Sequence, residues 1–548
     1  MAVLYIVILI GVLVFVHEFG HFIAARIFHV RVEHFSIGFG PKLCSIMRGD
    51  TEWEIRLLPL GGYVQMAGTD FEEITDPDDP DYASAYNNKP IWQKAIINLA
   101  GPLFNLLLPI PILFAVYFGT VTESLPASIG QVLDNAPAIE KLEPGDIVTR
   151  IDDEPIQYWG QLHDIIADNP GVPLQFEVQR DQETLHVEIV PQETVIRDAM
   201  DILDEKIGRI GITPDLAPAI IGITSEASAA AQSGLQTFDE IAAVNGVPVS
   251  SYVELERQVR HHSGVLELLV LRPQKIDVPY GNVSVLNLVK ITINTTETHL
   301  QNLGIASVNM YLTDVDENSP ASKAGLQVGD RILEIDGASI NVFRSFLDKL
   351  MLTWEQPHEL TVQRADRIFK TQIQLEKQFI VGEFQEELPI IYSGFYHRAP
   401  IVSPELVSMP IADRLLYAAK QSCTVTVNAS TLLAVSIVRM AQGRVSTKSL
   451  GGPIMIGHMA AKAGEEGIDM FLRMLAIISI NLGILNLIPI PLFDGGKLLI
   501  LLVEAVKRGP ISMRTRQIIA YIGLALVLML LMFAFKNDLE RMWNLFFS

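Results

Sequence analysis

The chain opens with MAVLYIVILIGVLVFVHEFGHFIAARIFHV (residues 1–30), and residues 17–21 of this apolar stretch read His-Glu-x-x-His. On a helix, His17 and His21 share one face with Cβ atoms about 6 Å apart, so both imidazoles can bind one zinc ion. Glu18 projects beside them as a candidate general base. The alternative is two histidines packed in a core and a glutamate that reaches the interface. Because ionisable groups are costly inside a membrane, the stretch predicts a metal site at membrane depth.

A catalytic zinc ion needs a third protein ligand and an open position for water. Asp494 is the candidate, and it follows Asn486, Pro489 and Pro491 in NLGILNLIPIPLFDGGKLL (residues 481–499). The two prolines break the helix and leave backbone groups free. Irregular backbone at membrane depth is tolerated where it lines a protein or water-filled cavity. The sequence therefore predicts that this aspartate meets the two histidines near the cytoplasmic face.

The composition indicates a mosaic of membrane and soluble parts. Of 548 residues, 49% are hydrophobic, yet the formal net charge is −22 and the mean hydropathy is +0.30. The acidic balance argues against nucleic acid as a partner, and two cysteines, Cys44 and Cys423, provide no disulfide framework and no cysteine zinc site. The first apolar run lacks a basic n-region, so we expect a retained span and not a cleaved signal peptide. Four runs approach the roughly 20 residues that cross a hydrocarbon core: 2–28, 95–118, 471–492 and 517–535.

Charges in the loops predict the orientation of these spans. The loop VEAVKRGPISMRTRQ (residues 503–517) is basic, and Arg26 and Arg31 flank the end of the first span, so both regions are expected in the cytoplasm. The termini and the long segment 120–470 then lie outside. Residues 423–438 form a further apolar run, but 16 residues are short for a span and a fifth crossing would invert everything downstream. We expect this run on the membrane surface or packed against the other spans.

The long outer segment contains three tandem repeats. Ile147, Ile241 and Ile332 are equivalent, at spacings of 94 and 91 residues. A second landmark, an apolar-Gly-apolar loop centred on Gly211, Gly304 and, less typically, Gly394, recurs at 93 and 90. The repeats resemble PDZ domains in the bacterial circular order, in which Gly211 and Gly304 offer backbone N–H groups to a peptide carboxylate. The alternative is that these glycines only make turns.

Several motifs together resemble the site-2 protease family, of the bacterial regulator-of-sigma-E type. The resemblance implies that His17, His21 and Asp494 bind one Zn²⁺ per chain and that Glu18 is the base. It also implies an intramembrane endopeptidase whose residues 35–66 dip into the membrane and pair with an unwound substrate as an added strand. The implied substrate-binding residues are Asn486, Pro489, Pro491, Gly61, Gly62 and Asn105. The motifs are VHEFGH (16–21), FSIGFGP (35–41), LPLGGYVQM (58–66), AGPLFN (100–105), LGGPI (450–454) and NLIPIPLFDGG (486–496).

The expected fold class is a polytopic α-helical membrane protein with four transmembrane helices, a membrane-reentrant β-hairpin and inserted α+β PDZ-like domains. Three such repeats depart from the two of the best-known members of the family. The expected segments are transmembrane helix 1 with the zinc motif, 1–29; the cytoplasmic and reentrant β-loop region, 30–94; transmembrane helix 2, 95–119; PDZ-like domains, 120–216, 217–309 and 310–398; a membrane-associated helical linker, 399–469; transmembrane helix 3 with the third ligand, 470–496; a cytoplasmic loop, 497–516; and transmembrane helix 4, 517–536.

The resemblance also implies the partners and the location. The expected substrates are single-pass transmembrane proteins already trimmed by another protease, such as a membrane-bound anti-sigma factor, within the lipid bilayer of a bacterial inner membrane. The PDZ-like domains are then periplasmic. Two alternatives belong to other classes: a membrane-tethered PDZ scaffold or chaperone with a degenerate zinc site, and a zinc peptidase that cleaves soluble peptides. The presence of all four metal-site residues argues against the scaffold or chaperone. The position of the zinc motif within a membrane span argues against the peptidase that cleaves soluble peptides.

Overall fold

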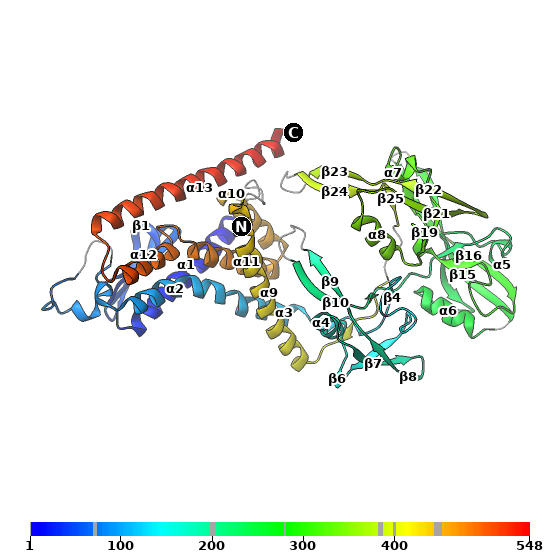
Figure 1. Cartoon of the computed structure of the whole chain (residues 1–548), viewed down its shortest axis with the longest axis horizontal. Coiled ribbons are helices and arrows are strands. Elements are labelled where there is room, and N and C mark those ends of the chain that lie inside the picture. Colours follow the sequence, from blue (N-terminus) through cyan, green and yellow to red (C-terminus); the bar gives the residue numbers. More distant parts are fainter. Residues whose placement is uncertain are drawn as a thin grey trace. The chain divides into compact units, whose positions relative to one another are not determined.

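The computed structural model describes residues 2–69, 74–197, 204–262, 264–278, 281–381, 387–397, 402–442 and 452–547. It divides into two compact units, and Figure 1 shows the long helices in one and most strands, with short helices, in the other. The helical unit comprises Met1–Thr122, Arg197–Leu203 and Met409–Ser548, and the repeat unit comprises Glu123–Ile196 and Asp204–Ser408. Two predicted features, the boundary at 398–399 and the first two residues of the LGGPI motif, lie outside the described residues.

Within its described residues, the helical unit contains five helical stretches that are long and apolar enough to cross a membrane: Leu4–Ile27, Ile91–Thr120, Ile411–Met440, Ile468–Leu487 and Arg514–Glu540. The helices of the unit are α1 (Ala2–Ile27), α2 (Ile91–Leu107), α3 (Pro109–Thr120), α9 (Ile411–Ala441), α10 (Pro453–Glu466), α11 (Ile468–Leu487), α12 (Asp494–Lys507) and α13 (Met513–Phe547).

Helix α9 differs from its prediction. The apolar run 423–438 was expected to be too short to cross, but it is the second half of a helix of 31 residues. The sequence argument counted only the uninterrupted apolar run, whereas the helix begins 12 residues earlier with a turn that carries Asp413 and Arg414. Length therefore does not exclude a fifth crossing, and the expected count of four spans is not confirmed. Helix α9 packs against α3 and α11, and Figure 1 shows it beside these two helices.

The direction of the other helices follows from their contacts. Helices α2 and α3 run antiparallel to α1, because Ile97 packs in one cluster with Ala25 at the end of α1 while Ile112 packs with Leu9 near its start. Helix α11 runs parallel to α1. Its Phe471 ring lies 5.2 Å from the ring of Tyr5, and the chain beyond its end returns to the middle of α1. The parallel arrangement brings the end of α11 to the zinc motif.

Helix α10 lies beside the first turns of α1, and α13 caps it. Gly457 of α10 faces Ile6, and Gly464 faces Tyr5, so both ends of this short helix lie near the start of α1. The buried Asp538 carboxylate of α13 accepts hydrogen bonds from the backbone N–H groups of Gly452, Ile454 and Met455. A side chain at Gly452 would collide with that carboxylate. The described part of the LGGPI motif is thus the N-terminus of a helix.

Strands β1 (Val32–Arg48) and β2 (Thr51–Met66) form more than the expected hairpin. Residues 44–48 pair with 51–55 as in a hairpin, but residues 34–37 pair with 62–65 antiparallel and also with 52–55 in parallel. The two strands therefore build a sheet of four segments in the order 62–66, 32–37, 51–56 and 42–48. The bend in β1 is made at Gly38 and Gly40, which both have positive φ.

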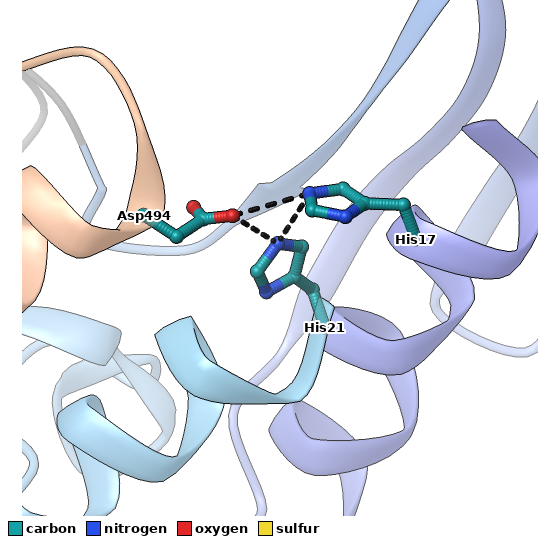
Figure 2. A group of neighbouring side chains, drawn as sticks. All are labelled: His17, His21 and Asp494. Atoms are coloured by element: carbon teal, nitrogen blue, oxygen red, sulfur yellow. Dashed lines mark hydrogen bonds and ion pairs between the residues drawn. The ribbon is translucent and has the colours of Figure 1, made fainter. Parts of the chain in front are cut away.

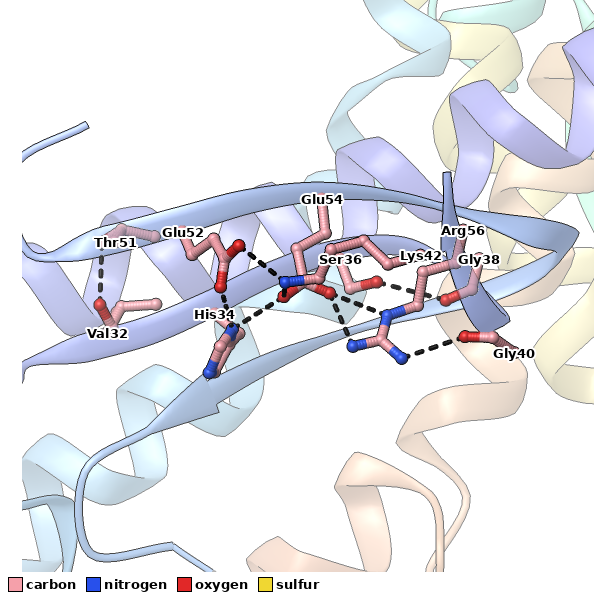
Figure 3. A network of polar contacts seen from close by, with 10 residues as sticks. All are labelled: Val32, His34, Ser36, Gly38, Gly40, Lys42, Thr51, Glu52, Glu54 and Arg56. Carbon is pink, nitrogen blue, oxygen red and sulfur yellow. Dashed lines mark hydrogen bonds and ion pairs between the residues drawn. The ribbon is translucent and has the colours of Figure 1, made fainter. Parts of the chain in front are cut away.

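The two faces of this sheet differ in polarity. Phe35 is fully buried and packs on Trp53, with ring centroids 4.4 Å apart, and on Phe22 of α1. Successive side chains of a strand point to opposite faces, so His34 lies on the other side, which carries the charged network of Figure 3. There the buried Glu54 carboxylate accepts hydrogen bonds or ion pairs from His34, Lys42 and Arg56, at 2.6 to 3.0 Å. This network ties three of the four segments together.

The repeat unit contains three copies of one α+β fold. In each copy, a four-stranded sheet carries one helix of 9 or 10 residues, and the first strand pairs with the strand after the glycine loop. The first copy contains β4 (Gln131–Val132), β5 (Ile147–Ile151), β6 (Glu154–Pro155), α4 (Trp159–Asp168), β7 (Leu174–Arg180), β8 (Glu183–Ile189), β9 (Gln192–Arg197), β10 (Asp204–Arg209) and β11 (Ile212–Thr213). The second contains β12 (Ile221–Ile223), α5 (Ala229–Gln232), β13 (Glu240–Val244), β14 (Val247–Pro248), α6 (Tyr252–Arg260), β15 (Gly264–Val278), β16 (Gly281–Thr295) and β17 (Ile305–Ser307). The third contains β18 (Asp314–Val315), α7 (Pro320–Lys323), β19 (Arg331–Ile335), β20 (Ala338–Ser339), α8 (Phe343–Leu352), β21 (His358–Arg364), β22 (Arg367–Ile373), β23 (Glu376–Val381), β24 (Glu387–Tyr392) and β25 (Phe395–Tyr396).

One ion pair recurs in all three repeats. A carboxylate that is at most 1% exposed accepts two hydrogen bonds from one arginine and caps a backbone N–H three residues earlier. The arginine bonds measure 2.7 to 2.8 Å. Bidentate pairs of this kind fix the angle between two strands as well as their distance. The pairs are Asp146 with Arg180, Asp239 with Arg272, and Asp330 with Arg364.

The first and last strands of the repeat unit pair with each other. Strand β3 (Glu123–Ser124) pairs with β26 (Val407–Ser408), with Ser124 opposite Val407. Inside the unit the repeats contact one another. The Asp134 carboxylate of the first accepts backbone hydrogen bonds from Asn341 and Val342 at the start of α8 in the third. The repeats are therefore one insertion with adjacent ends.

Candidate metal centre

Three side chains meet at the middle of the helical unit, and Figure 2 shows them pointing at one another. His17 Nε2 lies 3.1 Å and His21 Nε2 lies 3.3 Å from Oδ2 of Asp494. The two Nε2 atoms are 3.3 Å apart. The structure thus brings together three residues that sequence reasoning selected, although 473 residues separate the aspartate from the nearer histidine.

The local sequence explains how the aspartate arrives there. Helix α11 ends at Leu487, and the prolines at 489 and 491 prevent it from continuing. Leu492 takes a positive φ of 118°, which reverses the chain before α12 begins at Asp494. A carboxylate in the first turn of a helix is also favoured by the helix dipole. The break therefore places the carboxylate at a helix start, facing the α1 histidines.

The dimensions of the site suit a zinc ion. In a tetrahedral site with bonds of 2.0 to 2.1 Å, neighbouring ligand atoms lie about 3.3 Å apart. The three ligand atoms form a triangle with sides of 3.1, 3.3 and 3.3 Å. Two imidazoles and one carboxylate are also the donor set of many catalytic zinc sites, which keep the fourth position open. The residues present therefore fit zinc.

One face of α2 supports the two histidines. His21 Nδ1 lies 2.7 Å from the backbone oxygen of Ile97, and His17 Nδ1 lies 3.1 Å from the amide of Asn105. Between them, a Cβ at Gly101 would lie only 2.3 Å from His21 Nε2, so only glycine leaves room for this ring. Sequence reasoning did not assign these supporting roles. The sequence signal for these roles is that Ile97, Gly101 and Asn105 follow one another at intervals of four residues, on the helix that runs antiparallel to the helix of the zinc motif.

The aspartate is held on its other oxygen. Lys497, one turn further along α12, places Nζ 3.2 Å from Asp494 Oδ1, while Oδ2 faces the histidines. Its side chain is half-exposed, so this pair by itself contributes little to stability. Its effect is on orientation, because it leaves one carboxylate oxygen for the metal. Sequence reasoning also missed this lysine.

Glu18 lies beside the four-segment sheet. A Cβ at Gly62 would lie 2.6 Å from the Ser36 oxygen, 2.8 Å from Val14 and 3.2 Å from Glu18 Cγ, so the strand approaches α1 this closely only with glycine at that position. Within the described residues, Glu18 has no hydrogen bond or ion pair, and it is half-buried. The carboxylate is therefore free to accept a proton beside the metal ligands.

The comparison with known families gives one match that covers nearly the whole chain. Residues 5–530 match peptidase family M50. The chain belongs to peptidase family M50. This M50 chain is 29% identical to the regulator of sigma-E protease RseP of Salmonella typhimurium and 28% identical to that of Escherichia coli, in each case over 98% of both chains. A Vibrio cholerae relative, 28% identical over 98% of both chains, bears the name "Putative zinc metalloprotease". The chain is therefore a zinc metalloprotease.

The remaining residues predicted to contact substrate lie around the centre of this M50 chain, not in it. Gly61 packs under the ring of Phe39. Asn486 is half-buried in the last turn of α11, Pro489 is exposed, and the Pro491 carbonyl faces Gly523 of α13. Their contact with a substrate stays a prediction.

The glycines of the repeat loops have a structural reason to be glycine. Gly304 has a positive φ of 81°, and a Cβ there would lie 2.1 Å from Cβ of Ser228, the N-cap of α5. Gly211 meets Ala136 at the same distance. Both loops therefore pack on the helix or turn that follows the first strand, whether or not they bind a peptide. A solved PDZ domain of an SdrC-like protein from Listeria monocytogenes matches 17% of this chain and 88% of its own at 23% identity, with a TM-score of 0.13.

The third repeat holds a carboxylate at the corresponding loop. The backbone N–H of Asp316 donates to the Gly394 oxygen, and its carboxylate accepts hydrogen bonds of 2.7 Å from the hydroxyls of Tyr392 and Tyr396. The bond to Asp316 raises the pKa of Tyr392 to about 12. A fixed anion at this place repels a peptide carboxylate. The third loop is thus unsuited to the ligand that the first two were predicted to take.

Proposed function

We propose that this M50 chain is a zinc-dependent intramembrane endopeptidase that cleaves transmembrane segments of membrane proteins already trimmed by another protease. The observation that carries the proposal is the triangle of His17, His21 and Asp494, built from two helices, α1 and α12, of a unit whose described residues include five membrane-length helical stretches. The names of the relatives suggest a substrate that controls a sigma factor, such as a membrane-bound anti-sigma factor.

The residues around the triangle divide the work of hydrolysis. A zinc ion, one per chain, would supply an activated water and polarise the scissile carbonyl. Glu18 is placed to take a proton and to pass it to the leaving amine. The sheet beside it carries residues 58–66 at an edge, with a strand partner on one side only among the described residues. An unwound substrate segment added there as a strand regains the backbone hydrogen bonds that it lost with its helix.

The sheet is a candidate for insertion into the membrane. Its outer segment, 42–48, exposes Leu43, Ile46 and Met47, each more than 60% exposed. Exposed apolar side chains along one edge of a sheet suit contact with lipid. Its charged network is internally paired, which lowers the cost of bringing those groups near the bilayer.

For α9 we propose a position at the outer surface of the membrane, which leaves four spans. The start of α9 lies at the end of α3, where Arg414 donates to the Phe118 oxygen. The next element in the described part of the chain is α10, and it lies beside Tyr5 and Ile6 of α1, at that same end of the bundle. No crossing by α9 is needed to connect these points. The basic loop 503–517 is then cytoplasmic and the repeats are periplasmic, in a bacterial inner membrane.

The repeats then act as a filter that excludes membrane proteins with a bulky outer domain. Specificity by exclusion needs only a clash with the wrong partner. The anionic third loop supports exclusion over affinity, because at least that repeat is not built to bind a peptide carboxylate. The substrates admitted would be single-pass proteins whose outer part has been removed.

The decisive test uses the full chain in lipid vesicles with a single-pass model substrate. Glu18→Gln is expected to keep zinc and to lower cleavage by about 10²- to 10⁴-fold, because only the proton carrier is lost. Asp494→Asn is expected to lose zinc as well. Wild-type cleavage without bound zinc, or full activity of the Gln variant, contradicts the proposal. A scaffold with a degenerate site would bind no zinc in either form.

A further inference from the structure

The two histidines of the metal centre are held in different ways. His21 Nδ1 faces a backbone carbonyl oxygen, that of Ile97, at 2.7 Å. A carbonyl oxygen only accepts, so the proton of this imidazole is on Nδ1 and the lone pair of Nε2 faces Asp494. This is the tautomer that binds a metal through Nε2. The backbone thus prepares His21 with no help from a side chain.

His17 has a side chain at the same position. The terminal amide of Asn105 lies 3.1 Å from His17 Nδ1, and Asn105 is fully buried. With the amide nitrogen toward the ring, the amide oxygen is buried and has no partner among the described residues. That orientation also gives His17 the wrong tautomer, because a donor at Nδ1 requires the ring proton on Nε2, where the metal would bind.

We infer that Asn105 is a positioning residue whose amide oxygen accepts the Nδ1 proton of His17 and thereby leaves Nε2 free for the metal. The two ends of an amide have nearly the same shape, so a half turn about its last bond fits the same space. Rotating the amide in this way does not add a buried polar atom without a hydrogen-bond partner, because one end of the amide lacks a protein partner in either orientation. Acceptors of this kind behind metal-binding histidines orient the ring and raise its affinity.

The helix that carries Asn105 is fixed independently of this contact. The Ser479 hydroxyl of α11 donates a 2.6 Å hydrogen bond to the backbone oxygen of Asn105. This bond sets the rotation of α2 against α11, so the amide has one direction in which to point. The role assigned here therefore differs from the substrate contact that the sequence predicted for this residue. It rests on the proposed zinc site.

The test is zinc affinity of the full chain, measured by equilibration against graded zinc buffers, with variants of Asn105. Asn105→Leu is expected to weaken zinc binding by about 10- to 100-fold. Asn105→Asp keeps an acceptor and loses the donor, so it is expected to bind zinc at least as tightly as the wild type. Asn98→Leu is the matched control: Asn98 is buried on the same helix, but its amide donates to Tyr86 at 2.8 Å.

A spectroscopic readout separates positioning from folding. With cobalt in place of zinc, Asn105→Asp should keep the wild-type visible absorption, and Asn105→Leu should change it. The inference is overturned if Asn105→Leu binds zinc like the wild type, if Asn105→Asp binds as weakly as Asn105→Leu, or if Asn98→Leu loses as much affinity. A wild-type chain that binds no zinc would overturn the proposed function itself.

Discussion

The helical unit and the repeat unit use buried charge in opposite ways. The metal centre of the helical unit is a single constellation, from residues 17, 21 and 494, in which each residue has one supporting contact among the described residues. The repeat unit makes the same arginine–aspartate pair three times, each pair inside its own copy. We therefore expect a change at the metal centre to lower the proteolytic activity of the whole molecule. A change at one arginine–aspartate pair should lower the free energy of unfolding of a single repeat.

The largest expected effect comes from removing the repeat unit altogether. Ser124 and Val407 are paired, so residues 125–406 can be replaced by a short turn without pulling on the membrane helices. We expect cleavage of an untrimmed substrate to appear, while cleavage of the trimmed substrate and zinc binding persist. Both substrates are assayed in vesicles. Loss of trimmed-substrate cleavage with zinc still bound would show that the repeats bind substrate and do more than exclude it.

We expect the second-largest effect from adding a single methyl group at the metal centre. Gly101→Ala places a Cβ 2.3 Å from His21 Nε2, and the ring is already fixed by Ile97. We expect loss of zinc and a fall in cleavage of at least about 100-fold, in the range of a lost catalytic group. Gly11→Ala is the control, because Gly11 is on a membrane helix with open space around it. If the two variants had equal effects, the loss would come from disturbed helix packing and not from displacement of the His21 ring.

An intermediate effect should follow from breaking one buried pair. Arg272→Leu leaves the Asp239 carboxylate, which is 1% exposed, without its cation. The free energy of unfolding of the second repeat should fall by about 3 kcal/mol, the lower end of the range for such losses. Hydrogen exchange of the full chain measures it repeat by repeat. Zinc affinity should stay at the wild-type value, and a parallel loss of zinc would show that the units are energetically coupled.

The smallest effect should distinguish a clash from backbone strain. Gly304 and Gly234 both have positive φ, but a Cβ at Gly304 meets Ser228 whereas one at Gly234 meets nothing within 4 Å. Both alanine variants carry the cost of a left-handed residue, on the order of 1 kcal/mol. Only Gly304→Ala should destabilise the second repeat further, because of the clash with Ser228. This extra destabilisation should be seen as faster hydrogen exchange in the second repeat. If the two variants behave alike, the loop has room for a side chain and its glycine serves another purpose.

The sequence predicted the metal ligands because their chemistry is local. A spacing of four residues puts two histidines on one helix face, and two prolines before an aspartate mark a broken helix. The period of the repeats was equally visible, since the same landmarks recur along the chain. What the sequence did not reveal depends on which helix packs where. The carbonyl of Ile97 acts only because α2 runs antiparallel to α1, and no residue type signals a backbone contact.

The other differences also arise from tertiary structure. The four-segment sheet joins residues 34–37 to two separate parts of one strand, and the alternating pattern that predicted a hairpin cannot distinguish the two. The length of helix α9 was underestimated because the prediction counted only the uninterrupted apolar run 423–438, whereas the polar first turns, where Arg414 reaches a backbone oxygen, also belong to the helix. Snorkelling side chains allow a helix to extend past its apolar run.

The distance along the chain between the metal ligands also sets an order in time. A ribosome makes His17 and His21 first, and it makes Asp494 473 residues after the second histidine. Until then the nascent chain holds only two of the three residues that we propose as metal ligands. The proposed site is therefore complete only after the repeats have been made, and a chain that ends before residue 494 lacks its third ligand.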